Sequence, residues 1–353
     1  MGRQMAILKL LWRSCPFSVT IVAVWLLISC FSVIIANENG LPALIPYSST
    51  TIDFANSGAV SPLEAQDVES AYYRHWLGTD ELGRDVFAQL IYGSRTALLV
   101  GFFSVLISAF IGICLGMLAG FFGDHALKVS KTNALFVPLV LIPFTLYLIF
   151  VVPWSAIGFT PIGLLLLGLV LMIFLLAKFE QSKNREKKNV ALDLIIGRMI
   201  ETMDALPVLF IIISLSAIIR PSIFSVICII GISNWAQIAR YARSETLKIK
   251  QTAYLESARA IGMRKRAILM RHILPNALPT LGVALAFNVA AAILIEATLS
   301  FLGVGIGVEE ASWGSMLAEA RRSPFAWWIA VFPGLAIFAV VFACNQIAEA
   351  LSD

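Results

Sequence analysis

The stretch ALLVGFFSVLISAFIGICLGMLAGFF, residues 97–122, contains no charged side chain. A helix rises about 1.5 Å per residue, so about 20 apolar residues cross the roughly 30 Å hydrocarbon layer of a membrane. This stretch therefore predicts a membrane-spanning helix. Gly112, Gly116 and Gly120 recur at every fourth position and fall on one helix face, where another backbone can approach closely. We expect this stripe to pack against another helix of the same chain.

Similar apolar runs recur along the chain and predict an all-α, polytopic transmembrane helix bundle. The eight predicted spans lie at about residues 17–36, 97–122, 134–152, 161–178, 199–219, 222–240, 279–302 and 327–348. The 353 residues are 59% apolar and 14% charged, and the mean hydropathy is +0.86. Soluble domains carry about 25% charged residues, because a folded globule needs a polar surface. This composition argues against a soluble enzyme and excludes a disordered chain.

The spans divide the chain into three parts. Residues 1–36 hold an N-terminal transmembrane helix, residues 37–95 an extracytoplasmic segment, and residues 96–350 the main transmembrane domain. The basic N-terminus resembles a signal peptide, but its apolar run lacks a clear small-x-small cleavage site, so we expect an uncleaved helix. Within the main domain we expect two inserted spans at about 126–190 and a cytoplasmic loop at about 241–278.

Basic residues orient the bundle, because the cytoplasmic loops of membrane proteins are enriched in Lys and Arg. With a cytoplasmic N-terminus and an even number of spans, the inner segments hold 20 of the 26 Lys and Arg residues. We therefore expect a multi-pass membrane protein with both termini in the cytoplasm. The net charge of +4 gives no reason to expect a nucleic-acid partner.

No pattern in the sequence points to catalysis, a metal site or a bound cofactor. We interpret the cysteines, which form no CxxC pair, as small residues of the membrane core: Cys15, Cys30, Cys114, Cys228 and Cys344. The three histidines lie in polar stretches, HExxH is absent, and no GxSG-type stretch lies in a span, which argues against an intramembrane enzyme. The phosphate-binding pattern GxxxxGK[ST] is also absent, so this chain cannot cradle ATP by that route.

The segment HWLGTDELGRDVFAQLIYGSRTALLVG, residues 75–101, leads into the second span. Thr79 suits a helix N-cap, and Asp80 and Glu81 suit the positive end of a helix dipole. Arg84 follows Asp80 by four residues, so the two can pair on one helix face. Apolar residues follow at helical spacing, at Val86, Phe87, Leu90 and Ile91. The pattern predicts an amphipathic helix at the outer surface, and a structural lead-in is favoured over a binding site.

The basic region RYARSETLKIKQTAYLESARAIGMRKRAILMRHILPNALP, residues 240–279, is the most informative part of the chain. Residues 252–261 predict a short helix, and Gly262 offers it a left-handed stop. A second basic helix then runs to Pro275 and Pro279, which we expect to end it. Two short helices around a glycine form a knob that the groove of a soluble partner could grip. Composition alone favours a simpler interpretation, a basic loop anchored to anionic lipid.

This region resembles the EAA loop of ABC-importer permeases, in which EAA is followed by a glycine and an ending such as I-x-LP. The matching residues are Glu256, Ser257, Ala258, Gly262, Ile273, Leu274 and Pro275. Ser257 departs from the pattern, which has Ala there. Other stretches resemble the dipeptide, oligopeptide and nickel branch, namely HWLGTDELGRD at 75–85 (with Gly78, Thr79, Asp80, Gly83, Arg84 and Asp85), RHILPN at 271–276, LSFLG at 299–303 and WGSML at 313–317.

The resemblance implies the fold of an ABC importer type I permease, as a C-type subunit. Residues Glu256 to Gly262 would then dock on a cytosolic ATPase, which binds ATP and Mg in place of this chain. The resemblance also implies a second permease subunit, two ATPase subunits, an extracytoplasmic substrate-binding protein and a bacterial inner membrane. The expected cargo is a di- or oligopeptide, with nickel or another small solute as the alternative. The family has six spans, so the stretch at 126–190 is a departure.

Polar groups inside spans are costly, about 2.5–3.5 kcal/mol for a charge at the midplane on insertion scales, so each one needs a role. Candidates for the pathway or a subunit contact are Asn288, Glu296, Glu201 and Asp204. Glu296 lies deepest within its predicted span. For this residue we consider two roles equally: lining the pathway, or making a hydrogen bond that packs the helices. A secondary transporter without an ATPase is the alternative class, but the chain has no evident inverted repeat or ring of charges.

Overall fold

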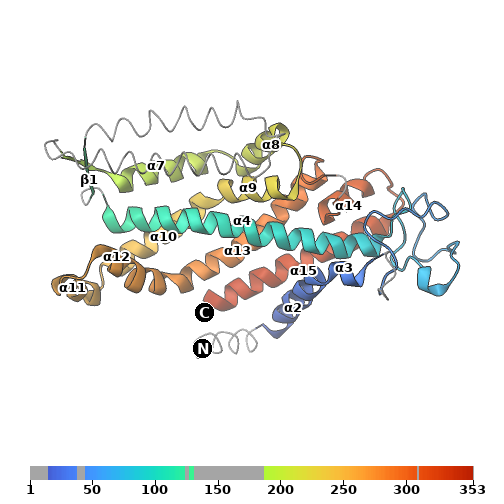
Figure 1. Ribbon diagram of the computed structural model, residues 1–353, viewed down its shortest axis with the longest axis horizontal. Coiled ribbons are helices and arrows are strands. Elements are labelled where there is room, and N and C mark those ends of the chain that lie inside the picture. Colours follow the sequence, from blue (N-terminus) through green and yellow to red (C-terminus); the bar gives the residue numbers. More distant parts are fainter. Residues whose placement is uncertain (1–14, 38–43, 124–126, 131–186, 308–309, 353) are drawn as a thin grey trace.

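The computed structural model describes residues 15–37, 44–123, 127–130, 187–307 and 310–352, which form an elongated helical bundle (Figure 1). The helices are α2 (Pro16–Cys30), α3 (Ser32–Ile35), η1 (Ala71–Tyr73), α4 (Val86–Phe122), α7 (Leu192–Ala205), α8 (Val208–Ile218), α9 (Ile223–Ser233), α10 (Trp235–Lys250), α11 (Ala253–Ala260), α12 (Lys265–Ile268), η3 (Leu269–Ile273), α13 (Leu274–Phe301), α14 (Trp313–Ala320) and α15 (Trp327–Ser352). The predicted helical class is confirmed. One addition is a short antiparallel ribbon of β1 (Leu127–Ser130) and β2 (Lys187–Val190), which no sequence pattern predicted.

Within the described residues, four helical units are long and apolar enough to cross a membrane. They are α4, α9 with α10, the unit from α12 to α13, and α15. The pair α7 and α8 adds a fifth if it is counted as one span bent by 83°. Helix α2 is apolar but only 15 residues long. The predicted spans at 134–152 and 161–178 lie outside the described residues, so the total of eight stays a prediction.

The bend between α7 and α8 interrupts the span predicted at 199–219. Leu206 has extended backbone angles, and it precedes Pro207, whose ring disfavours a helical conformation in the residue before it. The next span continues further than predicted, because only Asn234 separates α9 from α10. The second unit therefore extends to Lys250 and carries the basic region beyond the predicted boundary at 240.

The predicted amphipathic helix with Thr79 as its cap is wrong. Asp80 Oδ1 instead accepts a hydrogen bond from the backbone N–H of Arg84 at 2.8 Å, which closes a turn rather than the first turn of a helix. The helix begins six residues later than expected. Asp85 caps α4 by accepting a hydrogen bond from a backbone N–H of its first turn at 2.6 Å. From Val86 onward α4 is unbroken, and residues 79–85 do not form a helix of their own.

Helices α4 and α10 touch through their backbones along the glycine stripe. A β-carbon on Gly116 would lie 2.2 Å from the carbonyl oxygen of Ala239. For Gly112 and Gly120 the nearest atoms are also carbonyl oxygens of α10, at 2.7 and 2.8 Å. The three α10 residues that supply these oxygens are four positions apart, as the glycines are: Trp235, Ala239 and Arg243. The expected packing partner is therefore α10, the helix that leads to the basic region.

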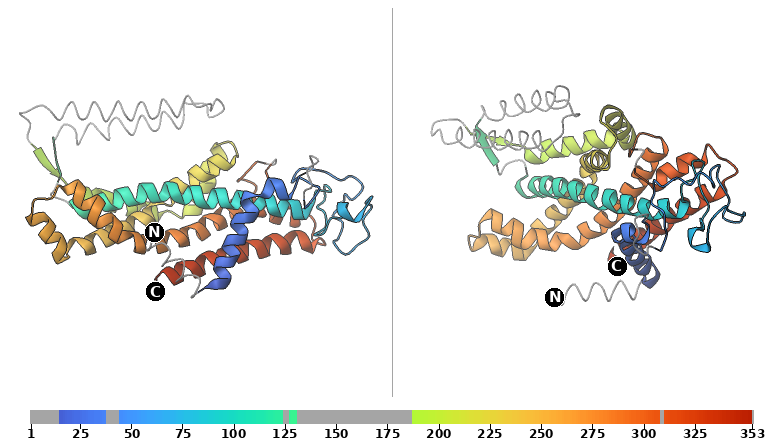
Figure 2. Two further views of the ribbon diagram at one scale, coloured as in Figure 1. Left: turned by 60° about the horizontal axis from the view of Figure 1, so that its bottom comes forward. Right: turned by 45° about the vertical axis from the view of Figure 1, so that its right-hand side comes forward.

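The two ends of the bundle carry different structures. Helices α11 and α12 lie at one end, and the outer segment and α14 gather at the opposite end (Figure 2). The long helices α4, α13 and α15 run between them. The length of these helices therefore separates α11 from the outer segment.

Candidate functional site

Helix α11 is a two-turn helix that projects from one end of the bundle. Leu255 is fully buried and Ala258 is 6% exposed, so these two side chains hold its inner face. Glu256 and Ser257 lie between them and are exposed. Ile261, directly after the helix, is 78% exposed. The outer face thus presents a carboxylate, a hydroxyl and a large apolar side chain, which are groups that a helix-in-groove contact can use.

Gly262 ends α11 in the left-handed conformation that the sequence predicts, with φ +78°. The N–H of Gly262 donates to the carbonyl of Arg259 at 3.0 Å, and the N–H of Met263 donates to the carbonyl of Ala258 at 3.2 Å. This pair of bonds is the Schellman arrangement, which satisfies the last carbonyls of a helix. A β-carbon on Gly262 would meet no atom within 4 Å. The glycine is therefore required by the backbone angle, and not by lack of space.

Ser257, which departs from the family pattern, uses its hydroxyl within the helix. Its hydroxyl donates to the carbonyl of Ala253 at 3.2 Å. The Glu256 carboxylate has no hydrogen-bond or ion-pair partner among the described residues, so it is available to another molecule. Asn276 of α13 donates to the Tyr254 hydroxyl at 2.8 Å and ties α11 to the start of the next long helix.

The prediction that two prolines end the second basic helix is wrong, because α12, η3 and α13 form one continuous helix. The N–H of Leu274 bonds to the carbonyl of Leu269, five residues back, which is a π-type turn. This wider turn lies directly before Pro275, whose missing N–H and bulky ring would otherwise break the regular ladder. Ile273 is fully buried, so the Ile-Leu-Pro ending anchors the α11 region to α13.

Helix α10 connects the α11 region to the bundle. Arg243 makes two bonds to Asp193 of α7, from Nε at 2.5 Å and from Nη2 at 2.8 Å. Arg240 of α10 forms a second ion pair with α7, through Asp204. Helix α10 is thus held to α7 by charge and to α4 by the glycine contact. A displacement of α11 would reach both neighbours through these contacts.

Two of the predicted intramembrane polar residues are buried, and each makes a hydrogen bond within this chain. Glu296 is 1% exposed and accepts a hydrogen bond from Ser300 Oγ at 2.8 Å. Asn288 is 4% exposed and donates to the carbonyl of Ala284 at 2.8 Å. Both partners lie on α13 itself, one helical turn away. The contacts found here are packing hydrogen bonds, and a pathway role for either residue stays a prediction.

The other two candidates lie on α7 and are accessible. Glu201 pairs with Arg198 at 2.8 Å, and both side chains are well exposed. Asp204, paired with Arg240, is also exposed. Their surface position is compatible with a subunit contact, which likewise stays a prediction.

At the opposite end, the lead-in residues form a clasp between the outer segment and the last two helices. The predicted Asp80–Arg84 pair forms at 2.7 Å, across a turn instead of along a helix. Arg84 also pairs with Glu319 of α14. Trp328 of α15 donates from Nε1 to the carbonyl of Thr79 at 3.0 Å. The motif therefore fastens the outer segment to α14 and α15.

The glycines of the lead-in motif allow close backbone approach. Gly78 and Gly83 have φ +80° and +85°, which L side chains rarely adopt. A β-carbon on Gly78 would lie 2.7 Å from the carbonyl oxygen of Val60, and one on Gly83 would lie 2.2 Å from that of Asp53. The motif thus also fixes the path of the loop that precedes it.

The WGSML stretch packs α14 onto its neighbours. Trp313 Nε1 donates to the carbonyl of Leu90 on α4 at 2.9 Å. A β-carbon on Gly314 would lie 2.2 Å from the carbonyl oxygen of Ala297 on α13. Sequence reasoning missed the roles of Glu319 and Trp328, because their partners lie more than 200 residues away and no local pattern marks them.

Metal and redox chemistry have no evident site in the described part of the chain. The five cysteines form no disulfide, and no group of three His, Cys, Asp or Glu residues could hold a metal ion there. That this chain binds no cofactor stays a prediction.

Comparisons with known proteins bear on the same regions. A family model described as "Binding-protein-dependent transport system inner membrane component" matches residues 185–352. The glutathione transport system permease protein GsiD of Pectobacterium atrosepticum is 31% identical over 280 residues, which cover 79% of this chain and 71% of that protein. The dipeptide transport system permease protein DppC of Alkalihalophilus pseudofirmus is 28% identical over 305 residues, 86% of this chain and 77% of that protein. A solved structure of the MetNI methionine ABC transporter in inward-facing conformations aligns with a TM-score of 0.47 and 15% identity, covering 75% of this chain and 97% of that one.

Proposed function

Because this chain belongs to the family of binding-protein-dependent transport system inner membrane components, we propose that it forms half of the translocation pathway of an ATP-driven importer. As a member of this family it is a transport permease subunit and not an enzyme. In the proposal, cytosolic ATPase subunits bind ATP and Mg²⁺, and one of them docks on α11. The cargo is a di- or oligopeptide.

The observation that carries the proposal is the construction of α11. Its inner face is anchored by buried Leu255 and its end is fixed by the Schellman arrangement at Gly262, while Glu256 stays exposed and unpaired among the described residues. A loop that only anchors to anionic lipid needs basic charge, and it does not need a capped helix that presents a carboxylate. The geometry therefore favours a protein partner over a lipid surface.

Coupling follows from the contacts of α10. An ATPase that binds α11 differently in two states of the bundle biases the equilibrium between them. Cargo delivered at the other end biases the same equilibrium, so the two sites are linked. The ion pair of Arg243 with Asp193 and the contact of Gly116 with Ala239 support a route from α11 through α10 to α7 and α4.

The peptide cargo rests on the names of the relatives. GsiD is named for glutathione and DppC for dipeptides, and glutathione is itself a small peptide. Nickel or another small solute is the alternative, and a screen of labelled peptides against nickel separates the two.

The remaining parts of the proposal concern assembly. A second permease subunit completes the pathway, and an extracytoplasmic binding protein delivers the cargo at the end that carries α14. The chain lies in a bacterial inner membrane, with α11 and both termini on the cytoplasmic side. The nine Lys and Arg residues between positions 240 and 272 support this orientation.

The test is a pull-down of the tagged chain from native membranes in mild detergent, with ATPase activity measured in the eluate. We expect activity with the wild type and a loss with Gly262→Arg or Glu256→Lys. Gly303→Arg is the matched control, because Gly303 also has a positive φ, +77°, and open space for a β-carbon, but ends α13 at the other end of the bundle. Gly262→Asn should retain activity, because Asn tolerates the left-handed region.

Equal ATPase recovery with Gly262→Arg, Glu256→Lys and wild type would count against docking at α11. If no sample brings an ATPase, crosslinking in intact membranes decides whether detergent has dissociated the complex. Failure to crosslink an ATPase there would remove the importer proposal.

A further inference from the structure

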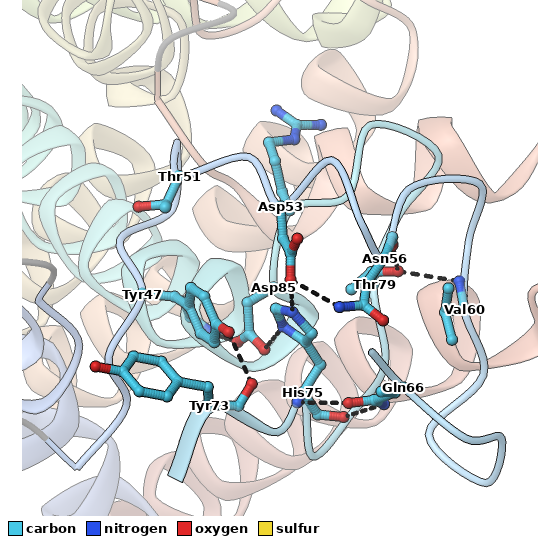
Figure 3. A network of polar contacts seen from close by, with 12 residues as sticks. Tyr47, Thr51, Asp53, Asn56, Val60, Gln66, Tyr73, His75, Thr79 and Asp85 are labelled. Atoms are coloured by element: carbon cyan, nitrogen blue, oxygen red, sulfur yellow. Dashed lines mark hydrogen bonds and ion pairs between the residues drawn. The ribbon is translucent and has the colours of Figure 1, made fainter. Parts of the chain in front are cut away.

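His75 is fully buried within the outer segment, and both of its ring nitrogens face carboxylates (Figure 3). Nδ1 lies 2.8 Å from Asp85 Oδ2, and Nε2 lies 3.2 Å from Asp53 Oδ2. The ring stacks on Tyr47, with centroids 4.4 Å apart. The side-chain amide of Gln66 holds the backbone N–H and carbonyl of His75 at 2.8 and 2.9 Å. The imidazole is therefore fixed in place and in orientation.

This arrangement determines the protonation state of the ring. An ionised carboxylate only accepts hydrogen bonds, a neutral imidazole has one N–H to donate, and an imidazolium has two. Asp85 already accepts the N-cap bond of α4 at 2.6 Å, and Asp53 accepts a bond from Asn56 Nδ2 at 2.8 Å, so both carboxylates are engaged as acceptors. Two acceptors on opposite sides of the ring require two donors. The imidazolium is the form that satisfies both contacts.

The two carboxylates belong to different parts of the structure. Asp85 caps the long helix α4, and its side chain is 1% exposed. Asp53 lies on the loop that runs over the lead-in turn, and its side chain is 22% exposed. Four backbone bonds join this loop to the turn, each at 3.0–3.1 Å: Asp53 N–H to Gly83, Gly58 N–H to Glu81, Ala59 N–H to Asp80 and Thr79 N–H to Val60. His75 thus joins a loop at the surface to the first turn of a long helix.

We propose that His75 is a proton-dependent lock, which as the imidazolium fastens the loop around Asp53 to the start of α4 and releases that loop when it loses its proton. A neutral ring keeps one donor. The N–H remains on Nδ1, toward the buried Asp85, and the Nε2 lone pair then faces the Asp53 carboxylate. Repulsion between them loosens the more exposed partner. The lock is a property of the outer segment, so it stands or falls independently of the α11 proposal.

The groups that face the ring set the pH range of the lock. Burial alone would lower the pKa of His75, but the hydrogen bonds and charges of Asp85 and Asp53 outweigh it, and the pKa lies above its ordinary value. Burial likewise opposes ionisation of Asp53, but bonds from Asn56 and His75 hold its pKa below its ordinary value. Burial and the two nearby carboxylates raise the pKa of Tyr47, which stays neutral.

The sign of the pH dependence follows from the raised pKa of His75. The lock is fully effective below the ordinary histidine pKa, about 6.5, and is lost progressively as pH rises through the folded value. Between the ordinary histidine pKa and the raised pKa of His75, the equilibrium constant for opening of the loop rises about tenfold per pH unit, because opening releases one proton. Above the raised pKa of His75 this constant no longer changes with pH.

The test is hydrogen–deuterium exchange of the full chain in lipid nanodiscs, corrected for the intrinsic pH dependence of exchange. The amides of Asp53, Gly58 and Ala59 report opening of the loop. In the wild type we expect their protection to fall about tenfold per pH unit above the ordinary histidine range and then to level off. Asp67→Asn is the matched control, because Asp67 lies exposed in the same segment and should keep the wild-type profile.

The decisive variant is Asp53→Asn. An amide at position 53 can donate to the Nε2 of a neutral ring, so the contact with His75 no longer needs the second proton. The bond from Asn56 Nδ2, which Asp53 Oδ2 accepts in the wild type, is lost in this variant at every pH. We expect this variant to have a lower protection that does not depend on pH, so that the pH slope is lost. His75→Gln should lower protection at every pH. A wild type without a pH slope, or the same slope in Asp53→Asn and the wild type, would overturn the proposal.

Discussion

The contact between α4 and α10 makes a sharp prediction for Gly116→Ala. The new β-carbon would lie 2.2 Å from the carbonyl oxygen of Ala239, whereas ordinary contacts begin at 3.4 Å. Both atoms belong to backbones, so no side-chain rotation can relieve the clash. The two helices must therefore separate by about 1 Å, which also loosens the contacts at Gly112 and Gly120.

The expected cost is that of an overpacked core, about 1–3 kcal/mol, and the upper part of this range applies because the obstacle is backbone. A domain of 150–250 residues changes its Tm by about 2–4 °C per kcal/mol, so we expect a decrease of about 4–12 °C. Gly282→Ala is the matched control. Gly282 lies within α13, and an added β-carbon there meets no atom within 4 Å. Replacing an open helical glycine by Ala gains about 0.5–1 kcal/mol, so this variant should have a slightly higher Tm than the wild type.

The assay is thermal unfolding of the purified chain in a background in which Cys30, Cys114 and Cys228, which are not buried, are replaced by Ser. A thiol-reactive dye then reports exposure of the buried cysteines, Cys344 among them. Fluorescence-detected chromatography before heating separates unfolding from aggregation. A Tm for Gly116→Ala within about 1 °C of the wild type, or an increase like that of Gly282→Ala, would refute the assigned backbone contact.

Two further predictions concern charged groups of the bundle. Arg243→Ala removes two hydrogen bonds to a partly exposed carboxylate, Asp193, so we expect a loss of about 1 kcal/mol and faster amide exchange in α7, whereas Arg198→Ala, which removes an exposed pair, should change neither. Exchange in α7 that is unaffected by Arg243→Ala would show that this pair does not hold the helix. Glu296→Ala leaves the buried Ser300 hydroxyl without its partner, at a cost of about 1–3 kcal/mol, whereas Glu296→Gln keeps an acceptor and should be milder. Unchanged transport and unchanged complex assembly in Glu296→Ala would remove both roles predicted for this residue.

Local chemistry explains why parts of the fold could be predicted from sequence. The apolar run at 97–122 predicts a span because the membrane imposes one length on every helix that crosses it. Gly262 predicts a left-handed stop because few residues other than glycine adopt that conformation without strain, and the structure confirms it. Both signals are contained within a few residues, so no knowledge of distant neighbours is needed.

The sequence predictions were wrong where a local pattern is compatible with two different structures. Thr79 followed by Asp80 suits a helix cap, but Asp80 uses its side chain to close a turn, and the cap falls to Asp85. Pro275 usually ends a helix, but a π-type turn before it lets the helix continue. At Pro207 the opposite occurs, because the chain bends by 83° within one predicted span. Sequence ranks these alternatives poorly, since packing against other helices selects between them.

The sequence by itself therefore determined the class of this protein, the orientation expected for it and the position of the α11 region, because hydrophobic length, charge distribution and backbone freedom act within short segments. Only the tertiary structure decided which helix faces the glycine stripe, which residues clasp the outer segment, and that His75 lies between Asp53 and Asp85. Those contacts join residues up to 249 positions apart, as Thr79 and Trp328 are. Their energies come from close packing and buried hydrogen bonds, which exist only once the helices have assembled.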